Sequence, residues 1–487
     1  MSFYEIGLLV GYALLLGVLM VYSGHAYFMV FLYRRAKREG VTPETGPLQE
    51  FPRVTVQLPI FNERYVVERL IDCVCDLDYP RDRLEVQVLD DSTDETVGIV
   101  ETLVHQYRSR GLDIVHCRRA NREGYKAGAL KAGLETAKGD FIAIFDADFT
   151  PPRDFLQRTI SRFTNPKVGV VQARWGHLNA EYSLLTRGEA IGLDGHFMIE
   201  QTARNRHGLF INFNGTCGVW RKQCILDAGN WQADTLTEDM DLSYRAQLRG
   251  WKFIYIEDLV CPGEIPAEVN AFKVQQFRWA KGAVQTAKKL LPKLWKGDFP
   301  FPVKVQATIH LTNHFVFPVL MLISIFSLPL LYIKVTYPEA RSYFLFASLF
   351  TLGAFSYPIF YIYSQKAIYP DWRKRLWALP FLMGGGIGIS VNNSKAVLGG
   401  LFGMKKGTFD RTPKYALGNK GGNWKGTKYR VPFKAVTILE LSLAGYTFFG
   451  FIFALRHHEL AALPFLLLYW LGYSYIGALS LAHALRR

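Results

Sequence analysis

Five long apolar stretches dominate the pattern of hydrophobic and polar positions along the chain: 7–33, 310–334, 342–364, 433–455 and 461–484. Each is long enough to cross a bilayer as one helix. The first is too long for a signal-peptide core, has no basic leader and is followed at once by basic residues. It predicts a retained anchor over 1–35 with its N-terminus outside. The later stretches predict membrane hairpins over 305–364 and 433–487.

Between the first two stretches the pattern changes to that of a soluble domain. From 52 to 262, short β-rich runs such as VTVQLPI, EVQVLDD and FIAIFDAD alternate with helical segments. This alternation predicts an α/β domain with a mostly parallel sheet and crossover helices. In residues 263–300, Lys, Arg, Trp and Phe are interleaved, which predicts interfacial helices at the membrane surface. A surface helix of the soluble domain is the alternative.

The stretch 376–403 is apolar but carries a run of glycines and several polar residues. If it crossed the bilayer, the basic run 405–434 would fall outside, against the positive-inside rule. We therefore expect 376–432 to be a re-entrant or interfacial segment followed by a basic loop. The sequence therefore predicts an integral protein of the plasma or inner membrane with about five crossings. Its soluble domain, its basic loop and Arg486–Arg487 would face the cytosol.

Composition and charge exclude several classes of protein. With 49% hydrophobic and 20% charged residues, the chain is not disordered. Lys and Arg outnumber Asp and Glu by 57 to 42, but the excess lies beside apolar stretches and accompanies no nucleic-acid motif. We therefore expect a lipid bilayer, and no nucleic acid, as a partner. The six cysteines form no C-x-x-C pair, which indicates cytosolic thiols.

Two predicted strands end in pairs of carboxylates. Asp90 and Asp91 end one strand, and Asp146 and Asp148 end another. The carboxyl ends of parallel strands are where open α/β sheets bind ligands. Side chains at i and i+2 of an extended segment project to the same side, and two such carboxylates can hold a hard divalent cation together with phosphate oxygens. The alternative is that these acidic residues only form turns.

The motif TLTEDMDL carries a candidate general base. Thr237, Glu238 and Asp239 lead a helix-like stretch. One interpretation is a helix N-cap, since Thr and acidic residues favour helix starts. The functional interpretation makes Asp239 a base that accepts a proton from an acceptor hydroxyl.

The motif QQFRW presents three different side chains on one helical face, at i, i+3 and i+4: Gln275, Arg278 and Trp279. Arg suits pyrophosphate oxygens, and an aromatic face suits the C–H surface of a sugar. Interfacial anchoring by Trp and Arg is the alternative. Three polar residues on one face of the next apolar stretch are expected to border the acceptor path, with polar contacts between helices as the alternative: His310, Asn313 and His314.

Together these motifs carry a resemblance to a known family. Asp90/Asp91, D-A-D at 146–148, T-E-D at 237–239 and Q-x-x-R-W at 275–279 resemble, in this order, the signature of the processive membrane glycosyltransferases of family 2. Cellulose, hyaluronan and chitin synthases belong to it. LPIFNERYV, REGYKAGALKAG and FNGTCGVWR are most similar to the plant cellulose-synthase-like group A mannan and glucomannan synthases and their bacterial relatives. The resemblance covers about 50–435.

The resemblance implies a GT-A fold for the soluble domain and a role for each matching residue. The donor would be bound by Pro59, Phe61, Glu63, Asp90, Asp91, Lys126, Asp146, Gln275 and Arg278. Mg²⁺ or Mn²⁺ would be bound by Asp146 and Asp148. Asp239 would be the catalytic base. The acceptor would be bound by Trp279, Glu238 and the loop residues Phe213, Asn214, Gly215, Thr216 and Cys217, the last of which is usually Ala in that group.

The stretch GTFDRTPKYA resembles the gating loop of cellulose synthases, which covers the donor site. The pattern F-x-x-T-x-K is formed by Phe409, Thr412 and Lys414. Arg411 stands where cellulose synthases commonly have Val. A solvated basic loop that only sets the topology is the alternative.

The expected function is inverting, metal-dependent synthesis of a β-linked polysaccharide of the cellulose, mannan or glucomannan type. The donor would be GDP-mannose, GDP-glucose or UDP-glucose, and the product would be extruded through the membrane. The alternative within the enzyme class is a single-addition transferase that glycosylates a lipid such as ceramide or diacylglycerol. A transporter or receptor that only senses a nucleotide sugar is a third class, and the intact catalytic motifs count against it.

Overall fold

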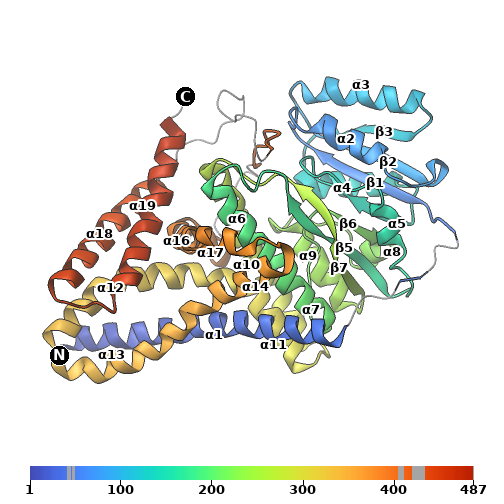
Figure 1. Cartoon of the computed structure of the whole chain (residues 1–487). Coiled ribbons are helices and arrows are strands. Elements are labelled where there is room, and N and C mark those ends of the chain that lie inside the picture. The colour runs from blue at the N-terminus through green and yellow to red at the C-terminus, as the bar shows by residue number, and fades with distance from the viewer. Residues whose placement is uncertain (41–44, 47–49, 404–410, 419–433, 486–487) are drawn as a thin grey trace.

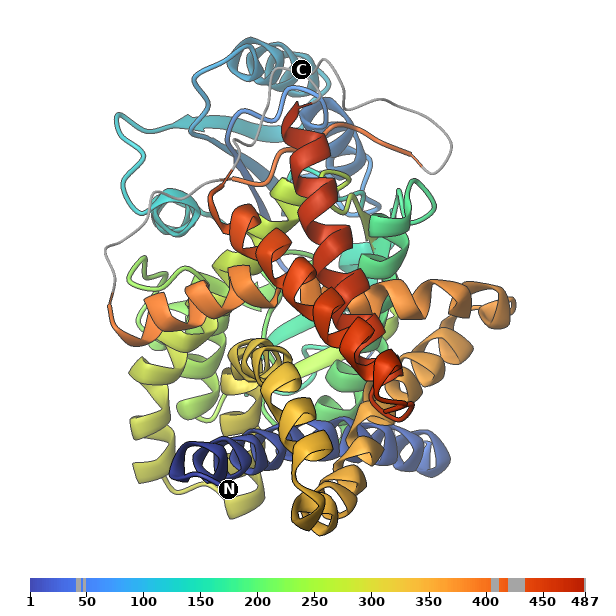
Figure 2. The same cartoon turned by 90° about the vertical axis from the view of Figure 1, so that its left-hand side faces the viewer.

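The computed structural model of the chain describes residues 1–40, 45–46, 50–403, 411–418 and 434–485. A sheet domain and a set of long helices lie beside each other (Figure 1). The helix α1 (Phe3–Glu39), in blue, runs along the bottom of the molecule in Figures 1 and 2. The strands β1 to β3 lie at the opposite end in both views.

A seven-stranded sheet forms the core of the soluble domain, in the order β3-β2-β1-β4-β6-β5-β7. Only β6 is antiparallel to its neighbours β4 and β5, so the prediction of a mostly parallel sheet is confirmed. The strands are β1 (Val54–Ile60), β2 (Leu84–Asp90), β3 (Asp113–Arg118), β4 (Phe141–Ile144), β5 (Val168–His177), β6 (Gly218–Arg221) and β7 (Lys252–Gly263).

Helices cover both faces of this sheet. The sequences of its central strands are therefore nearly continuous apolar runs. Leu70 and Leu156 join the core on one face, and Leu130 and Leu242 join the core on the other. The first face is covered by α2 (Val67–Cys75), α3 (Thr96–Ser109) and α5 (Phe155–Ile160). The second face is covered by α4 (Tyr125–Thr136), α8 (Lys222–Asp227) and α9 (Glu238–Leu248).

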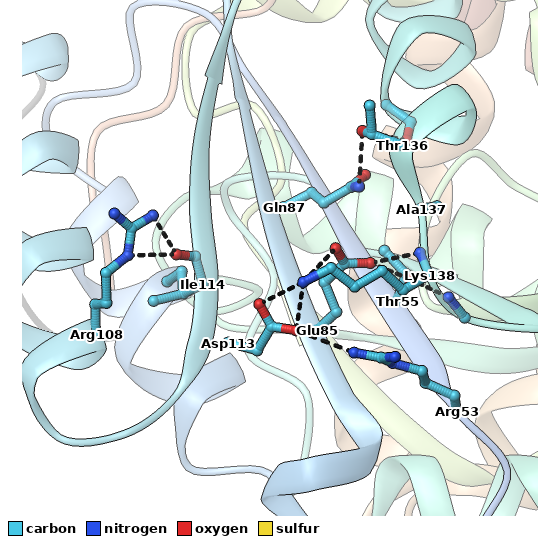
Figure 3. A network of polar contacts seen from close by, with 12 residues as sticks. Arg53, Thr55, Glu85, Gln87, Arg108, Asp113, Ile114, Thr136, Ala137 and Lys138 are labelled. Atoms are coloured by element: carbon cyan, nitrogen blue, oxygen red, sulfur yellow. Dashed lines mark hydrogen bonds and ion pairs between the residues drawn. The ribbon is translucent and has the colours of Figure 1, made fainter.

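Polar side chains, of which Thr55 and Glu85 are buried, link the amino ends of the parallel strands to one another (Figure 3). Thr55 Oγ1 donates a hydrogen bond to Glu85 Oε2 at 2.6 Å, and the backbone N–H of Lys138 donates to the same oxygen at 2.8 Å. Lys138 Nζ also pairs with Asp113 Oδ2 at 2.8 Å. Because this network satisfies its buried groups at the amino ends, it stabilises the sheet away from the carboxyl ends, where ligands bind.

Within the described residues, five helical segments are long and apolar enough to cross a membrane: Phe3–Glu39, Phe301–Thr336, Pro338–Ile368, Val436–Arg456 and Leu463–Leu485. They correspond to the apolar stretches of the sequence and indicate an integral membrane protein. They are built from α1, α11 (Phe301–Thr312), α12 (Val316–Thr336), α13 (Arg341–Ser348), α14 (Ser356–Ile368), α18 (Val436–Arg456) and α19 (Leu463–Leu485). The last two run side by side, in red in Figures 1 and 2.

The stretch 376–403 forms two short helices, α16 (Leu379–Gly388) and α17 (Ser390–Leu401), with a break at Ile389. Each is shorter than a single membrane span. The first packs against α19 and α6 (Leu184–Asp194), and the second packs against α10 (Val269–Lys296). A re-entrant or interfacial placement of this stretch stays a prediction. Other short helical elements include α7 (Thr202–Arg206), α15 (Trp372–Arg375), a π-helical turn, Gly195–Gln201, and several 3-10 turns.

Helix α10 connects the soluble domain to the membrane helices through buried polar contacts. Glu268 caps its first turn by accepting from the backbone N–H groups of Asn270 and Ala271. Lys273, with 1% of its side chain exposed, pairs with Glu440 of α18 at 2.8 Å. Because a buried charge without a partner is costly, this pair fixes α10 against α18.

Candidate active site

The carboxyl ends of β1, β2 and β4 border a cavity of about 220 Å³. Helices α9 and α10 and the segment 411–418 complete its wall. Most of the predicted site residues meet here, from segments far apart in the sequence: Pro59, Phe61, Glu63, Asp91, Lys126, Asp146, Asp148, Asn214, Gly215, Glu238, Asp239, Gln275, Arg278, Trp279, Arg411, Thr412 and Lys414. The cavity therefore lies where open α/β sheets bind ligands.

Asp90 was expected to bind the donor, but it is not among the residues that border this cavity, and its role in donor binding stays a prediction. It is 1% exposed, and its carboxylate accepts from the backbone N–H of Ser92 at 2.8 Å and pairs with His116 Nε2 at 2.9 Å. Asp90 thus fixes the turn after β2, while Asp91 reaches the cavity wall.

The loop FNGTC contributes only part of its length to the wall. Gly215 has a φ of +80°, and a Cβ there would lie 3.1 Å from Asp239 Oδ2 and 3.5 Å from Lys126 Nζ. Glycine is therefore needed both for the backbone conformation and for the close approach of these two groups. Asn214 also borders the cavity, but three residues of the predicted acceptor loop are buried behind the wall: Phe213, Thr216 and Cys217.

Asp146 and Asp148 each pair with a lysine. Lys126 Nζ donates to Asp146 Oδ1 at 2.5 Å, and Lys414 Nζ donates to Asp148 Oδ2 at 2.6 Å. Two hard carboxylate donors in one cavity fit Mg²⁺ or Mn²⁺. Within the described residues no third His, Cys, Asp or Glu is placed to join them, so phosphate oxygens and water would supply the other ligands.

Asp239 is the second residue of α9, and Thr237 occupies the N-cap position. Its Oδ1 accepts from the backbone N–H of Met240 at 2.8 Å. Burial raises the pKa of Asp239 to about 7, and the neighbouring Glu238 carboxylate adds to the rise. A carboxyl group with a pKa near neutrality suits general base catalysis at physiological pH.

One face of α10 carries the Q-x-x-R-W side chains into the wall of the cavity. Arg278 Nη2 donates to Thr412 Oγ1 at 3.1 Å, which joins this helix to the segment 411–418. One turn further along, a Cβ at Gly282 would lie 2.5 Å from the Thr237 methyl group. The glycine therefore allows α10 to approach the T-E-D motif closely.

The segment 411–418 lies against the wall of the cavity through charged contacts. Arg411 Nη1 pairs with Glu63 Oε1 at 3.0 Å and donates to the Phe61 carbonyl at 3.2 Å. Burial raises the pKa of Glu63 to about 8, and the charge of Arg411 opposes that rise. Phe409, the first residue of the predicted gating pattern, lies outside the described residues.

Two arginines at this edge were not predicted. Arg119 forms a bidentate contact with Asp91, at 3.0 and 2.5 Å, and the Arg122 guanidinium lies over the Phe61 ring, 3.3 Å from its centroid. Such a contact is a cation–π interaction. Both arginines follow β3, so the rule that ligands bind at carboxyl strand ends would have found them if it had been applied to this third parallel strand.

A second cavity, of about 770 Å³, extends among the apolar helices. Six residues border both cavities: Trp175, Leu193, Asn214, Thr237, Asp239 and Trp279. The candidate base and the candidate sugar platform therefore stand where the two spaces meet. The polar residues expected along an acceptor path also border the larger cavity: His310, Asn313 and His314.

The mostly parallel sheet, the carboxylates at its ligand edge and the basic groups facing them define a glycosyltransferase of the GT-A fold. Residues 52–282 match the model of the family described as glycosyltransferase like family 2. This match agrees with the family and the enzyme class expected from the motifs.

The chain is also similar to curated relatives and, in fold, to one solved structure. Glucomannan 4-beta-mannosyltransferase 2 of Arabidopsis thaliana is 44% identical over 286 residues, 56% of this chain and 53% of that protein. Glucomannan 4-beta-mannosyltransferase 1 of Cyamopsis tetragonoloba is 42% identical over 267 residues, 54% of this chain and 51% of that protein. The chain spans about half the length of the curated relatives it matches. The mannosyltransferase PcManGT from Pyrobaculum calidifontis, solved in complex with GDP-Man and Mn²⁺, is 22% identical with a TM-score of 0.55. That match covers 80% of this chain and 100% of that one.

Proposed function

We propose that the protein transfers mannosyl units from GDP-mannose to a growing β-linked mannan or glucomannan, with inversion at the anomeric carbon. The observation that carries this proposal is the meeting of the two cavities at Asp239 and Trp279. A donor at the sheet edge and an acceptor chain among the membrane helices would face each other there. The names of the matched relatives support mannose as the transferred sugar.

The reaction is a single in-line displacement. Asp239 takes the proton from the acceptor hydroxyl, whose oxygen forms a bond to the anomeric carbon. The bond from that carbon to the phosphate oxygen breaks, and GDP leaves with the bonding electrons. Lys126 and Arg278 hold the phosphate oxygens from two sides, and Arg278 can do so in a bidentate manner.

Asp146 and Asp148 would hold Mg²⁺ or Mn²⁺ at the ligand edge. When bound, the metal ion neutralises charge that develops on the leaving diphosphate. In the structure the ammonium groups of Lys126 and Lys414 pair with these carboxylates. A bound diphosphate would give both lysines an alternative anionic partner, and their pairing partners would change on substrate binding.

The same arrangement suits a protein that works across a membrane. We propose that the soluble domain faces the cytosol, where nucleotide sugars are made, and that the larger cavity leads the product into the membrane. The basic residues beside the apolar stretches support this orientation.

One assay tests the proposed function. Purified protein in lipid nanodiscs receives GDP-mannose, GDP-glucose or UDP-glucose in turn, with Mn²⁺ present. We expect nucleotide release from GDP-mannose and a product that lengthens with time and is cleaved by a β-mannanase. A lipid carrying one or two sugars would replace the proposal with the glycolipid alternative. The absence of nucleotide release from all three donors would contradict the proposed function.

The pH dependence of kcat/KM should follow the titration of the Asp239 carboxyl group. Because the base must be unprotonated, kcat/KM is expected to fall by about tenfold per pH unit below about pH 7 and to level off above it. Glu238→Gln removes a charge that raises the Asp239 pKa, so its acidic limb should move to lower pH. Rates measured from pH 5 to pH 9 with both proteins test this. An acidic limb at the same pH in both would contradict the assignment.

Substitutions of Arg278 and Trp279 should impair different steps of the reaction. Arg278 borders only the donor cavity, whereas Trp279 borders both cavities. Arg278→Lys keeps the charge but loses the bidentate fork, so we expect a higher KM for GDP-mannose. Trp279→Ala should bind GDP-mannose nearly normally but stop elongation, since the acceptor loses its aromatic platform. Donor affinity and product length are the measurements.

Membrane anchoring by these two residues predicts another result. Both variants would then lose stability in the bilayer and fail together, and thermal unfolding in nanodiscs would reveal this. If Trp279→Ala loses donor affinity as severely as Arg278→Lys, the assignment of Arg278 to donor binding and Trp279 to acceptor binding is wrong.

A further inference from the structure

Glu189 is a buried acid that the reaction described above does not use. It lies on α6, one turn before Leu193, and only 7% of the residue is exposed. Neither carboxylate oxygen has a hydrogen-bond partner among the described residues. Glu189 borders the larger cavity but not the donor cavity, whereas Leu193 borders both. The acid is therefore placed on the membrane side of the junction, close to it.

Two more buried polar atoms in the same wall lack a partner within the described part of the chain. One is the indole N–H of Trp175, and the other is the Oδ1 of Asn212. Trp175 borders both cavities and packs against Phe149 and Phe197, with ring centroids 5.0 and 4.9 Å away. A buried polar group without a partner is costly, and three such groups around one cavity fit a polar ligand.

We propose that Glu189 and Trp175 bind the sugar units of the acceptor that follow the reacting end. This rests on the proposed function and adds an acceptor subsite to it. Glu189 supplies hydrogen bonds to sugar hydroxyl groups on the membrane side of the junction. Trp175 supplies its indole N–H at the junction itself, with Asn212 as a further acceptor.

The chemistry of these groups suits a neutral carbohydrate. Burial raises the pKa of Glu189 to about 8, although the charge of Lys414 opposes the rise. The protonated acid can both donate and accept a hydrogen bond, as a sugar hydroxyl requires. A lipid acyl chain would leave Glu189, Trp175 and Asn212 unpaired, so a glycan is the better occupant.

The test separates hydrogen bonding from packing at Glu189. Glu189→Leu keeps the bulk but removes both polar atoms, whereas Glu189→Gln keeps one donor and one acceptor. With mannotetraose as acceptor, we expect Glu189→Leu to raise the acceptor KM about tenfold and Glu189→Gln to stay near the wild-type value. With mannose as acceptor, both variants should behave as wild type. The KM for GDP-mannose should not change in either.

A structural role predicts the opposite pattern. If Glu189 were only a core residue, Leu would remove an unsatisfied polar group, raise the unfolding temperature and leave the mannotetraose KM unchanged. That outcome would overturn the proposal. Trp175→Phe provides an independent test, because it keeps the aromatic packing and removes only the indole N–H. It too should raise the mannotetraose KM, and a normal KM in this variant would equally count against the subsite.

Failure of the proposed function would look different. If the wild-type protein uses another nucleotide sugar, its own oligosaccharide replaces mannotetraose and the comparison of the three variants is unchanged. If the wild type glycosylates only a lipid, the acceptor subsite fails together with the polysaccharide assignment. If the wild type elongates mannotetraose and Glu189→Leu does so with the same KM, the subsite alone is wrong.

Discussion

Asp239→Asn is expected to lower kcat by a factor on the order of 100 or more while leaving the fold intact, since general base catalysis contributes about that much. Asn has the same shape, and its side-chain oxygen can still accept the hydrogen bond that the Met240 backbone gives to Asp239. The amide cannot take a proton from the acceptor hydroxyl. GDP release at saturating acceptor measures the loss, and the affinity for GDP-mannose should remain near that of the wild type.

A matched control distinguishes this loss from a general effect of removing a carboxylate. Asp227 pairs with Arg249 at 3.3 Å and accepts from Trp251 Nε1 at 2.8 Å, outside the walls of both cavities. Asp227→Asn should therefore turn over normally. If Asp239→Asn also turns over at the wild-type rate with the wild-type unfolding temperature, its carboxylate serves the helix terminus and not the chemistry.

The sheet was predictable where strands are buried on both faces. The run VTVQLPI predicted β1 because most of its positions are apolar, and the structure buries nearly all of them. The strands β6 and β7 were not predicted, for two different reasons. The first is only four residues long. The second pairs with β5 with two shifts of register, between Val168 and Val170 and between Ala173 and Arg174, and polar residues such as Glu257 and Asp258 interrupt its pattern.

The sequence predicted the location of the candidate site at one edge of the sheet, but it did not predict which residues contact one another there. The strand-end rule brought Asp91, Asp146 and Asp148 together. It could not tell which of two adjacent residues borders the cavity, and Asp90 pairs with His116 on the neighbouring strand. The pairing of Lys414 with Asp148 joins segments 266 residues apart, and no local pattern encodes such a contact.

In the membrane region, the sequence likewise predicted the helices but not how they pack against one another. Apolar length alone located the five candidate spans, because the bilayer thickness sets a minimum helix length. It did not reveal that the spans leave a cavity beside Asp239. That depends on helix packing between distant segments, as does the placement of Glu189 in its wall.

The second large effect is expected at the D-A-D pair. EDTA should abolish turnover, and Asp146→Asn should lower kcat by about 100-fold and raise the Mn²⁺ concentration needed for half-maximal activity, because a metal ion supplies several kcal/mol at the leaving diphosphate. Asp146 is the better position to change than Asp148. Its side chain is 34% exposed, whereas Asp148 is 5% exposed and holds the Lys414 ammonium. Removing Asp148 would leave a buried charge unpaired and confuse stability with catalysis.

The ion pair between Asp146 and Lys126 supplies the control that separates metal binding from simple charge pairing. Lys126→Gln removes the same ion pair as Asp146→Asn but leaves both carboxylates in place. If the carboxylates bind the metal ion, Lys126→Gln lowers the rate through the lost phosphate contact and keeps the wild-type Mn²⁺ midpoint, whereas Asp146→Asn shifts that midpoint upward. If Asp146 only neutralises Lys126, neither variant shows an altered dependence on Mn²⁺, and EDTA has no effect on the wild type. Manganese titrations of the three proteins, read as GDP release, decide between these mechanisms, and full activity in excess EDTA would refute the metal site.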